Sequence, residues 1–288
     1  MSHDVLQAIV IFAAGLAAGT INTVVGSGTL ITFPTLLAFG YPPVLANVSN
    51  NVGLVPGVAS GVYGYRAELA GQRQRLIRLG SASLCGGLLG AILLLVLPAG
   101  AFKAIVPVLI GIALVMVVFQ PRLSRWVAAR ELKRSAPLAP PAGGPEVDGA
   151  AAAGGLTSVS LIAPASQDAA LQLGGPALWV LVFLSGVYGG YFGAAQGVLL
   201  LGLMGVAFTD SMQRINAVKN VLAGLVNGVA AVVFVIATHI DWGAAGLIAC
   251  GAILGGQLGA RIGRKLPPWG LRVLIICVGV AALAKLLA

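Results

Sequence analysis

Long apolar runs separated by short polar turns are the feature that most constrains this chain. Several runs exceed the roughly 20 residues that a helix needs to cross the apolar core of a bilayer. Only 9% of the 288 residues are charged while 58% are hydrophobic, which is too little charge to cover the surface of a soluble domain. The sequence therefore predicts an all-α polytopic membrane protein. The apolar segments cover about 5–25, 29–40, 43–65, 79–98, 101–120, 176–195, 197–208, 211–238, 242–260 and 269–287.

Two of these segments, 29–40 and 197–208, are too short to span a membrane. Each has about 12 residues and would reach roughly 18 Å as a helix, against a core of about 30 Å. We expect each to form a hairpin of broken or re-entrant helices with the segment before it. Non-helical backbone at that depth is tolerated only where protein buries it or where it lines a cavity.

A polar stretch at 121–175 divides the chain into an N-terminal membrane half, 1–120, and a C-terminal one, 176–288. The stretch opens with "PRLSRWVAARELKRS", a basic amphipathic sequence expected on the cytoplasmic surface. It continues as "APLAPPAGGPEVDGAAAAGGLTSVS", whose Pro, Gly, Ala and Ser content is typical of a disordered linker.

The two halves resemble each other in the order and spacing of short motifs. "GLAAGTINTVVGSG" from Gly15 aligns with "GVYGGYFGAAQG" from Gly186, which pairs Gly26 with Gly197. "ANVSNN" aligns with "NAVKNV", which pairs Ser49 with Lys219, and "LCGGLLGA" aligns with "ACGAILGG". We interpret the halves as repeats of one unit, each made of a broken hairpin and three further transmembrane helices.

Basic residues occupy non-equivalent loops of the two repeats. The loop at 66–78 carries four arginines while its counterpart "THIDWG" has none, and "GYPP" is uncharged while its counterpart "TDSMQR" carries Arg214. Since basic loops face the cytoplasm, equivalent loops face opposite sides and the repeats are inverted. The predicted topology in the cell (inner) membrane places both termini outside, and 66–78, the linker and 261–268 in the cytoplasm.

Lys219 is a basic residue inside an apolar segment. A helix starting near Asp210, with Thr209 or Asp210 as N-cap, places Lys219 roughly 14 Å along it, near mid-membrane. A charge there must face the protein interior or a wet cavity, although a later helix start would let the lysine snorkel to the interface. All eight acids of the chain lie in loops or at segment ends. We therefore infer that the missing partner of Lys219 is an anionic substrate.

Further hydrogen-bonding groups gather on the same helix face and in the two hairpin breaks. Helix N-termini and free backbone amides in such breaks are suited to anions, whereas the other glycines serve close helix packing. The chain has no motif for a metal, a cofactor or an enzymatic nucleophile, and its basic residues follow the topology rule rather than a nucleic-acid-binding pattern. The predicted substrate-binding residues are Lys219, Asn220, Asn216, Asn50, Asn22, Thr23, Ser27, Gln196 and Ser49.

The chain resembles the TauE/SafE sulfite exporters, also called the 4-toluene sulfonate uptake permeases. The resemblance rests on "GSGTLITFPTLLAFGYPPVLANVSNN", "GVYGYRAEL", "INAVKNVLAGLVNG" and "GGQLGARIGRKLPPWGLR", and it covers nearly everything except the linker. It departs from the family in the first glycine-rich turn, Gly-Ser-Gly-Thr, and in the second, Ala-Ala-Gln-Gly. The resemblance implies export of small sulfur-containing anions such as sulfite or organosulfonates.

The leading hypothesis is a secondary transporter of these anions that works by alternating access. The alternatives are an importer of another small organic anion, and an accessory membrane subunit whose linker binds a partner. A membrane-embedded enzyme would need an acid, a histidine or a nucleophile at depth, and the sequence offers none. A homo-oligomer is compatible with the sequence, which does not specify one.

Overall fold

The computed structural model describes residues 3–135, 175–208 and 210–262, together with five single positions between 273 and 284. All regular structure in these ranges is helical, which confirms the predicted all-α class. Five helices are long and apolar enough to cross a membrane. The elements are α1 (His3–Val24), α2 (Thr29–Ala38), α3 (Pro43–Gly64), the 3-10 helix η1 (Arg66–Leu69), α4 (Arg73–Val96), α5 (Ala99–Ser135), α7 (Pro176–Tyr191), α8 (Gln196–Ala207), α9 (Met212–Ala237) and α10 (Trp242–Ile262).

The two short segments form short helices, as predicted. α2 has 10 residues and α8 has 12, and each follows a longer helix across a break of four residues, 25–28 and 192–195. We call these residues, each with the first two residues of the helix that follows, the first and second breaks. Gly26 and Gly193 adopt positive φ angles of 89° and 77°, a backbone conformation that glycine tolerates and that stops α1 and α7 from continuing.

α5 extends further than the apolar pattern predicts. It continues past residue 120 to Ser135, so the basic sequence 121–135 is the end of α5 rather than a separate surface element. Its alanine, arginine, leucine, glutamate and lysine residues favour helix strongly enough to carry the helix beyond Pro121. The predicted disordered linker at 136–174 and most of the predicted segment 269–287 lie outside the described residues.

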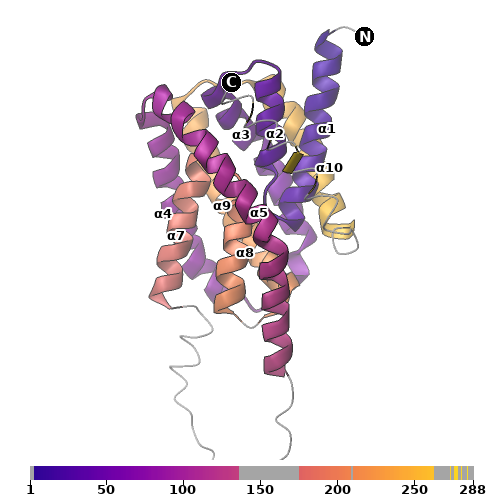
Figure 1. Ribbon diagram of the computed structural model, residues 1–288, viewed down its shortest axis with the longest axis vertical. Helices are drawn as coiled ribbons and strands as arrows, with labels where there is room; N and C mark the ends of the chain where they lie inside the picture. Colours follow the sequence, from indigo (N-terminus) through magenta and orange to yellow (C-terminus); the bar gives the residue numbers. More distant parts are fainter. Residues whose placement is uncertain are drawn as a thin grey trace, which may run out of the picture.

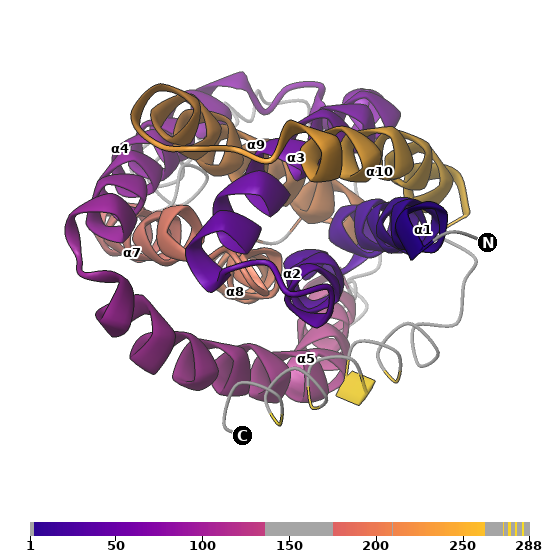
Figure 2. The ribbon, with the colours of Figure 1, turned by 90° about the horizontal axis from the view of Figure 1, so that it is seen from above.

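The helices pack in a ring around the two short ones. α1 packs on α10, α10 on α3, α3 on α9, α9 on α4, and α4 on α7. Seen from above, α2 and α8 lie inside this ring, and α5 runs along the side that they face (Figure 2). α3 and α9 are neighbours at the middle of the bundle, and each carries the polar residues of its half.

The packing is reciprocal between the halves. α1 of the first half packs on α10 of the second, and α7, its counterpart, packs on α4 of the first. Both crossings are made of glycines whose added Cβ atoms would meet backbone atoms of the opposing helix, which confirms the predicted packing role. These glycines are Gly15, Gly19, Gly251, Gly255 and Gly259 at one crossing, and Gly186 and Gly190 at the other.

The first helices of the two halves begin at opposite ends of the bundle. α1 begins at the upper end, near the marked N-terminus, and α7 begins at the lower end (Figure 1). The loop between α3 and α4 meets the loop between α8 and α9 at one end, through the contact of Arg214 with Ala70. The turn between α2 and α3 lies at the other end, where Tyr41 and the start of α10 come together through Asp241.

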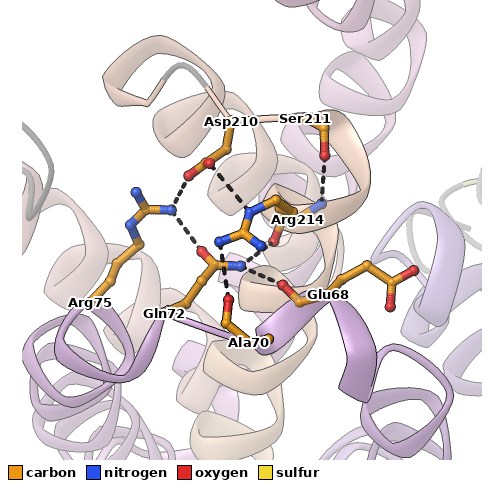
Figure 3. A network of polar contacts seen from close by, with 7 residues as sticks. All are labelled: Glu68, Ala70, Gln72, Arg75, Asp210, Ser211 and Arg214. Carbon is orange, nitrogen blue, oxygen red and sulfur yellow. Dashed lines mark hydrogen bonds and ion pairs between the residues drawn. The ribbon is translucent and has the colours of Figure 1, made fainter.

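A carboxylate flanked by two arginines joins the halves at what we call the basic end, residues 65–78 and 208–214. Asp210 forms an ion pair with Arg75 and a second with Arg214, whose Nε lies 3.3 Å from Oδ1 (Figure 3). The Arg75 guanidinium also stacks over Phe208, 3.8 Å from the ring centroid. Ser211, rather than Thr209 or Asp210, is the N-cap of α9, because the Asp210 carboxylate is occupied by the arginines.

Gln72 ties the same end together through backbone groups. Its Nε2 donates to the carbonyls of Glu68, at 2.8 Å, and Arg214, at 3.4 Å, and its Oε1 accepts from Arg75 (Figure 3). Arg214 also donates to the Ala70 carbonyl at 3.2 Å. The basic end is therefore a continuous polar network between the first and second halves.

The opposite end is held by Asp241. Its Oδ1 accepts from the Ala244 amide at 2.8 Å, so it caps α10, and its own amide donates to the Ser49 hydroxyl at 3.0 Å. Tyr41 lies in the turn before α3 and accepts a hydrogen bond from Gln7 at 3.3 Å. Burial, and then the neighbouring Asp241 carboxylate, raise the pKa of the Tyr41 phenol above its ordinary value.

Candidate functional site

Lys219 is completely buried within the protein. None of its surface is exposed, and its Nζ donates to the backbone carbonyls of Asn22, at 3.0 Å, and Thr23, at 3.3 Å. α9 begins at Met212, so Lys219 lies roughly 11 Å along the helix, nearer its start than predicted. The side chain nevertheless points inward, and the alternative of a lysine snorkelling to the interface is wrong.

The ammonium group lies at the C-terminal end of the broken helix α1. The last carbonyls of a helix have no intrahelical partner and carry the negative end of its dipole. The Thr23 carbonyl accepts three hydrogen bonds, from Lys219, from Asn216 at 3.1 Å and from Asn220 at 3.3 Å. The polar face of α9 thus caps α1, which explains why its residues recur at helical spacing.

Asn22 and Thr23 belong to the site through their backbone rather than their side chains. The Thr23 hydroxyl is occupied by the Gly19 carbonyl of its own helix, at 2.9 Å. Asn22 is half-buried, and its side chain has no hydrogen bond to the described part of the chain. The sequence analysis expected their side chains to contribute, whereas the groups that contact Lys219 are their backbone carbonyls.

The two breaks touch each other. The Gly197 amide donates to the Gly26 carbonyl at 3.1 Å, and a Cβ on either glycine would overlap the other's Cα. These two glycines are equivalent in the alignment of the halves, so equivalent points of both breaks meet at one place. Ser27 and Gln196 are the neighbours of these glycines, and both are buried.

Several buried polar atoms around this junction have no partner among the described residues. They include the Ser27 hydroxyl, the Gln196 Nε2 and the Asn216 Oδ1. Buried polar groups in native proteins are nearly always paired, so these three atoms are ones that a bound molecule could satisfy. The amides just before α2, at Ser27 and Gly28, likewise make no hydrogen bond to described backbone.

Asn50 contacts α2, whereas Lys219 contacts the end of α1. It is buried, accepts from the Thr32 hydroxyl and donates weakly to the Thr29 hydroxyl at 3.5 Å. Both threonines belong to α2, so Asn50 anchors the short helix that begins after the first break. Its side chain lies beside the site residues of that break rather than beside the ammonium group.

The structure does not bring Ser49 to Lys219, although the two residues are equivalent in the alignment. The Ser49 hydroxyl accepts from the Asp241 amide at the far end of the bundle. α3 instead places Ser49 at the end of the bundle where α10 starts. Ser49 holds the start of α10.

Sequence reasoning missed Asn47. Its Nδ2 donates to the Tyr191 carbonyl at 3.0 Å, so α3 caps the end of α7 much as α9 caps the end of α1. The signal was present, because asparagines at 47 and 50 share one face of a helix.

Phe192, in the second break, packs edge-on against Phe33 and Phe102 at 5.2 and 6.3 Å between ring centroids.

No carboxylate of the described residues neutralises Lys219. Asp4 is exposed at the start of α1, Glu68 lies in η1, Asp210 pairs with arginines at the basic end, and Asp241 caps α10. The described ranges also contain no group of three or more histidine, cysteine or acidic side chains that could hold a metal ion. The site therefore consists of one cation, amide donors and hydroxyls.

Comparison with known proteins gives a consistent result over the whole chain. A family described as Sulfite exporter TauE/SafE matches residues 11–286. The Escherichia coli K12 protein named "Probable membrane transporter protein YfcA" is 23% identical over 96% of this chain and 88% of its own length. A Sinorhizobium protein named "Probable membrane transporter protein ORF9" is 32% identical over 36% of this chain and 40% of its own length. No solved structure matches.

Proposed function

The chain belongs to the TauE/SafE sulfite exporter family and is a membrane transporter, and from this premise we propose that it carries small sulfur-containing anions such as sulfite or organosulfonates. The single observation that carries the proposal is that Lys219 is buried and that no carboxylate among the side chains that the structure describes pairs with it. Carbonyl dipoles orient an ammonium group but do not neutralise it. A buried charge is stable only when paired, so an anion at the junction of the breaks supplies what the protein lacks.

The site suits a small oxyanion in particular. The ammonium group of Lys219, the unpaired Nε2 of Gln196, the hydroxyl of Ser27 and the free amides of the first break are all donors. Tetrahedral and pyramidal oxyanions accept hydrogen bonds from several directions, and amides at a helix start are suited to them. Asn50 and Asn220 hold the surrounding helices in place.

We propose that transport proceeds by alternating access between inverted repeats. The reciprocal packing of α1 on α10 and of α7 on α4, and the meeting of Gly26 with Gly197, support a pseudo-two-fold axis through the site. The polar network around Asp210 fastens one end, so this end opens only when the network breaks. The other end is held more simply, by the Ser49–Asp241 contact.

The direction of transport and the orientation follow from the same proposal. The protein lies in the inner membrane of the cell, with the basic end in the cytoplasm and both termini outside. The family implies that the anion moves outward. Import of another organic anion would use the same site in the reverse direction.

Thermal unfolding of the purified full-length protein with a panel of anions tests the proposal. Sulfite and small sulfonates should raise the melting temperature more than acetate or phosphate at equal concentration, since ligands that bind only the folded state stabilise it. Lys219→Gln should abolish the shift, whereas Arg78→Gln, which removes a partly exposed charge in the first turns of α4, should keep it. Equal shifts for all anions, or a full shift with Lys219→Gln, would refute the proposed substrate site.

A further inference from the structure

We infer that the site prefers an anion with one negative charge and one hydrogen-bond donor of its own, such as hydrogensulfite, and that Asn216 detects the donor. This inference rests on the proposed function and narrows its substrate class. The evidence is the orientation of the Asn216 amide, the absence of a partner for its oxygen, and the single positive charge at the site.

The orientation of the Asn216 amide is fixed by its neighbour. Its Nδ2 donates to the Thr23 carbonyl at 3.1 Å, and this carbonyl also accepts from Lys219 and Asn220. The reverse orientation would place two acceptors against each other. The Oδ1 atom is therefore on the other branch of the amide, where it has no partner among the described residues although Asn216 is only 5% exposed.

Nearby donors of the protein are already engaged. The amide nitrogen of Asn220 is used by the Thr23 carbonyl, and the Lys219 ammonium group donates to the carbonyls of Asn22 and Thr23. An unpaired acceptor in a site otherwise made of donors favours a ligand that brings a proton of its own. A fully deprotonated oxyanion would instead turn a lone pair toward Oδ1, and a methyl group would leave Oδ1 unpaired.

The charge of the site points to the same ligand. Within the described residues, Lys219 is the charged group at the end of α1; Arg75 and Arg214 are paired with Asp210 at the basic end, and Asp241 lies at the opposite end. One ammonium group neutralises a monoanion and leaves a dianion with excess charge in a buried place. A protonated monoanion satisfies both Lys219 and Asn216, and each transported anion then carries one proton with it.

Binding of two monoanions to the purified full-length protein tests this inference. Hydrogensulfite, in its O–H form, and methanesulfonate have the same charge and three oxygens on sulfur, but none of the oxygens of methanesulfonate carries a proton, and its sulfur bears a methyl group. We expect hydrogensulfite to bind about tenfold more tightly to the native protein, the effect of about one hydrogen bond. Asn216→Leu, similar in size but without the acceptor, should lose this preference and still bind methanesulfonate, which shows that the variant is folded.

A pH series on the native protein provides a second test that needs no variant. Affinity for total sulfite should fall as the pH rises through the second ionisation of sulfurous acid, while affinity for methanesulfonate stays constant over the same range. A parallel fall for both anions would place the titration in the protein and overturn the inference, as would equal affinities or an unchanged preference in Asn216→Leu. Failure of the proposed function is distinct: neither anion would bind, or Lys219→Gln would leave both affinities unchanged.

Discussion

The contact between Gly26 and Gly197 brings the two breaks together, and four glycine-to-alanine variants measure its contribution. Gly26 combines a positive φ angle with close contact, whereas Gly40 has a nearly equal φ of 87° and open space around a Cβ. Gly197 has the contact at the start of a helix, and Gly228, inside α9, has open space around a Cβ. The set separates backbone strain from overlap between the breaks.

The expected free energies differ enough to be measured. An alanine in the left-handed backbone conformation lowers the free energy of unfolding by about 1–2 kcal/mol, and a methyl group added at a tightly packed contact lowers it by about 1–3 kcal/mol. Gly26→Ala should therefore lower the free energy of unfolding by about 2–5 kcal/mol, Gly40→Ala by about 1–2 and Gly197→Ala by about 1–3. Gly228→Ala should raise it by up to about 1 kcal/mol, because alanine favours helix.

Unfolding in mixed micelles with increasing denaturing detergent gives these values, and transport in liposomes gives their consequence. In Gly26→Ala and Gly197→Ala the added methyl group should move the breaks apart by about an ångström, and the transport rate should fall by about a hundredfold. Gly40→Ala and Gly228→Ala should transport at close to the native rate. Equal losses for Gly26→Ala and Gly40→Ala would show that the breaks do not depend on this contact.

Two further predictions concern the groups that hold the halves together. Asp210→Asn should lower the free energy of unfolding by about 1 kcal/mol, because both ion pairs are partly exposed to solvent, and Asp4→Asn at the exposed start of α1 should have no effect. Equal free energies of unfolding for Asp210→Asn and Asp4→Asn would show that the network does not hold the two halves together. Asn47→Leu should cost about 1–3 kcal/mol because it leaves the Tyr191 carbonyl unpaired, compared with less than about 0.5 for the half-buried Asn51→Leu. The same detergent titration measures both, and a smaller loss for Asn47→Leu than for Asn51→Leu would contradict the capping role.

Much of the architecture follows from apolar periodicity, because membrane helices must satisfy their backbone internally. The short helices and the glycine crossings were predicted, since segment length and small residues determine them directly. The extension of α5 was missed because the apolar pattern stops at residue 120 while helix propensity does not.

The surroundings of the proposed site residues were predicted in part. Lys219 was identified because a lysine without an acid in an apolar segment has few stable environments, and the structure buries it. Its carbonyl partners were missed, because a free carbonyl at the end of a broken helix leaves no mark on residue type. Ser49 was assigned to the site because it aligns with Lys219. An alignment does not specify the end of the bundle at which a residue lies, and Ser49 lies beside the start of α10.

Uptake of labelled sulfite into liposomes containing the purified protein tests the central claim most directly, with Lys219→Gln and Arg78→Gln as a matched pair that removes one positive charge each. Removing one partner of a buried charge pair costs about 2–5 kcal/mol, so Lys219→Gln should slow uptake by at least about thirtyfold. Arg78→Gln, at a partly exposed position in the first turns of α4, should retain the native rate. Native uptake by Lys219→Gln, or uptake by the native protein no faster than by protein-free liposomes, would contradict the assignment of the buried ammonium group as the anion-binding centre of a transporter.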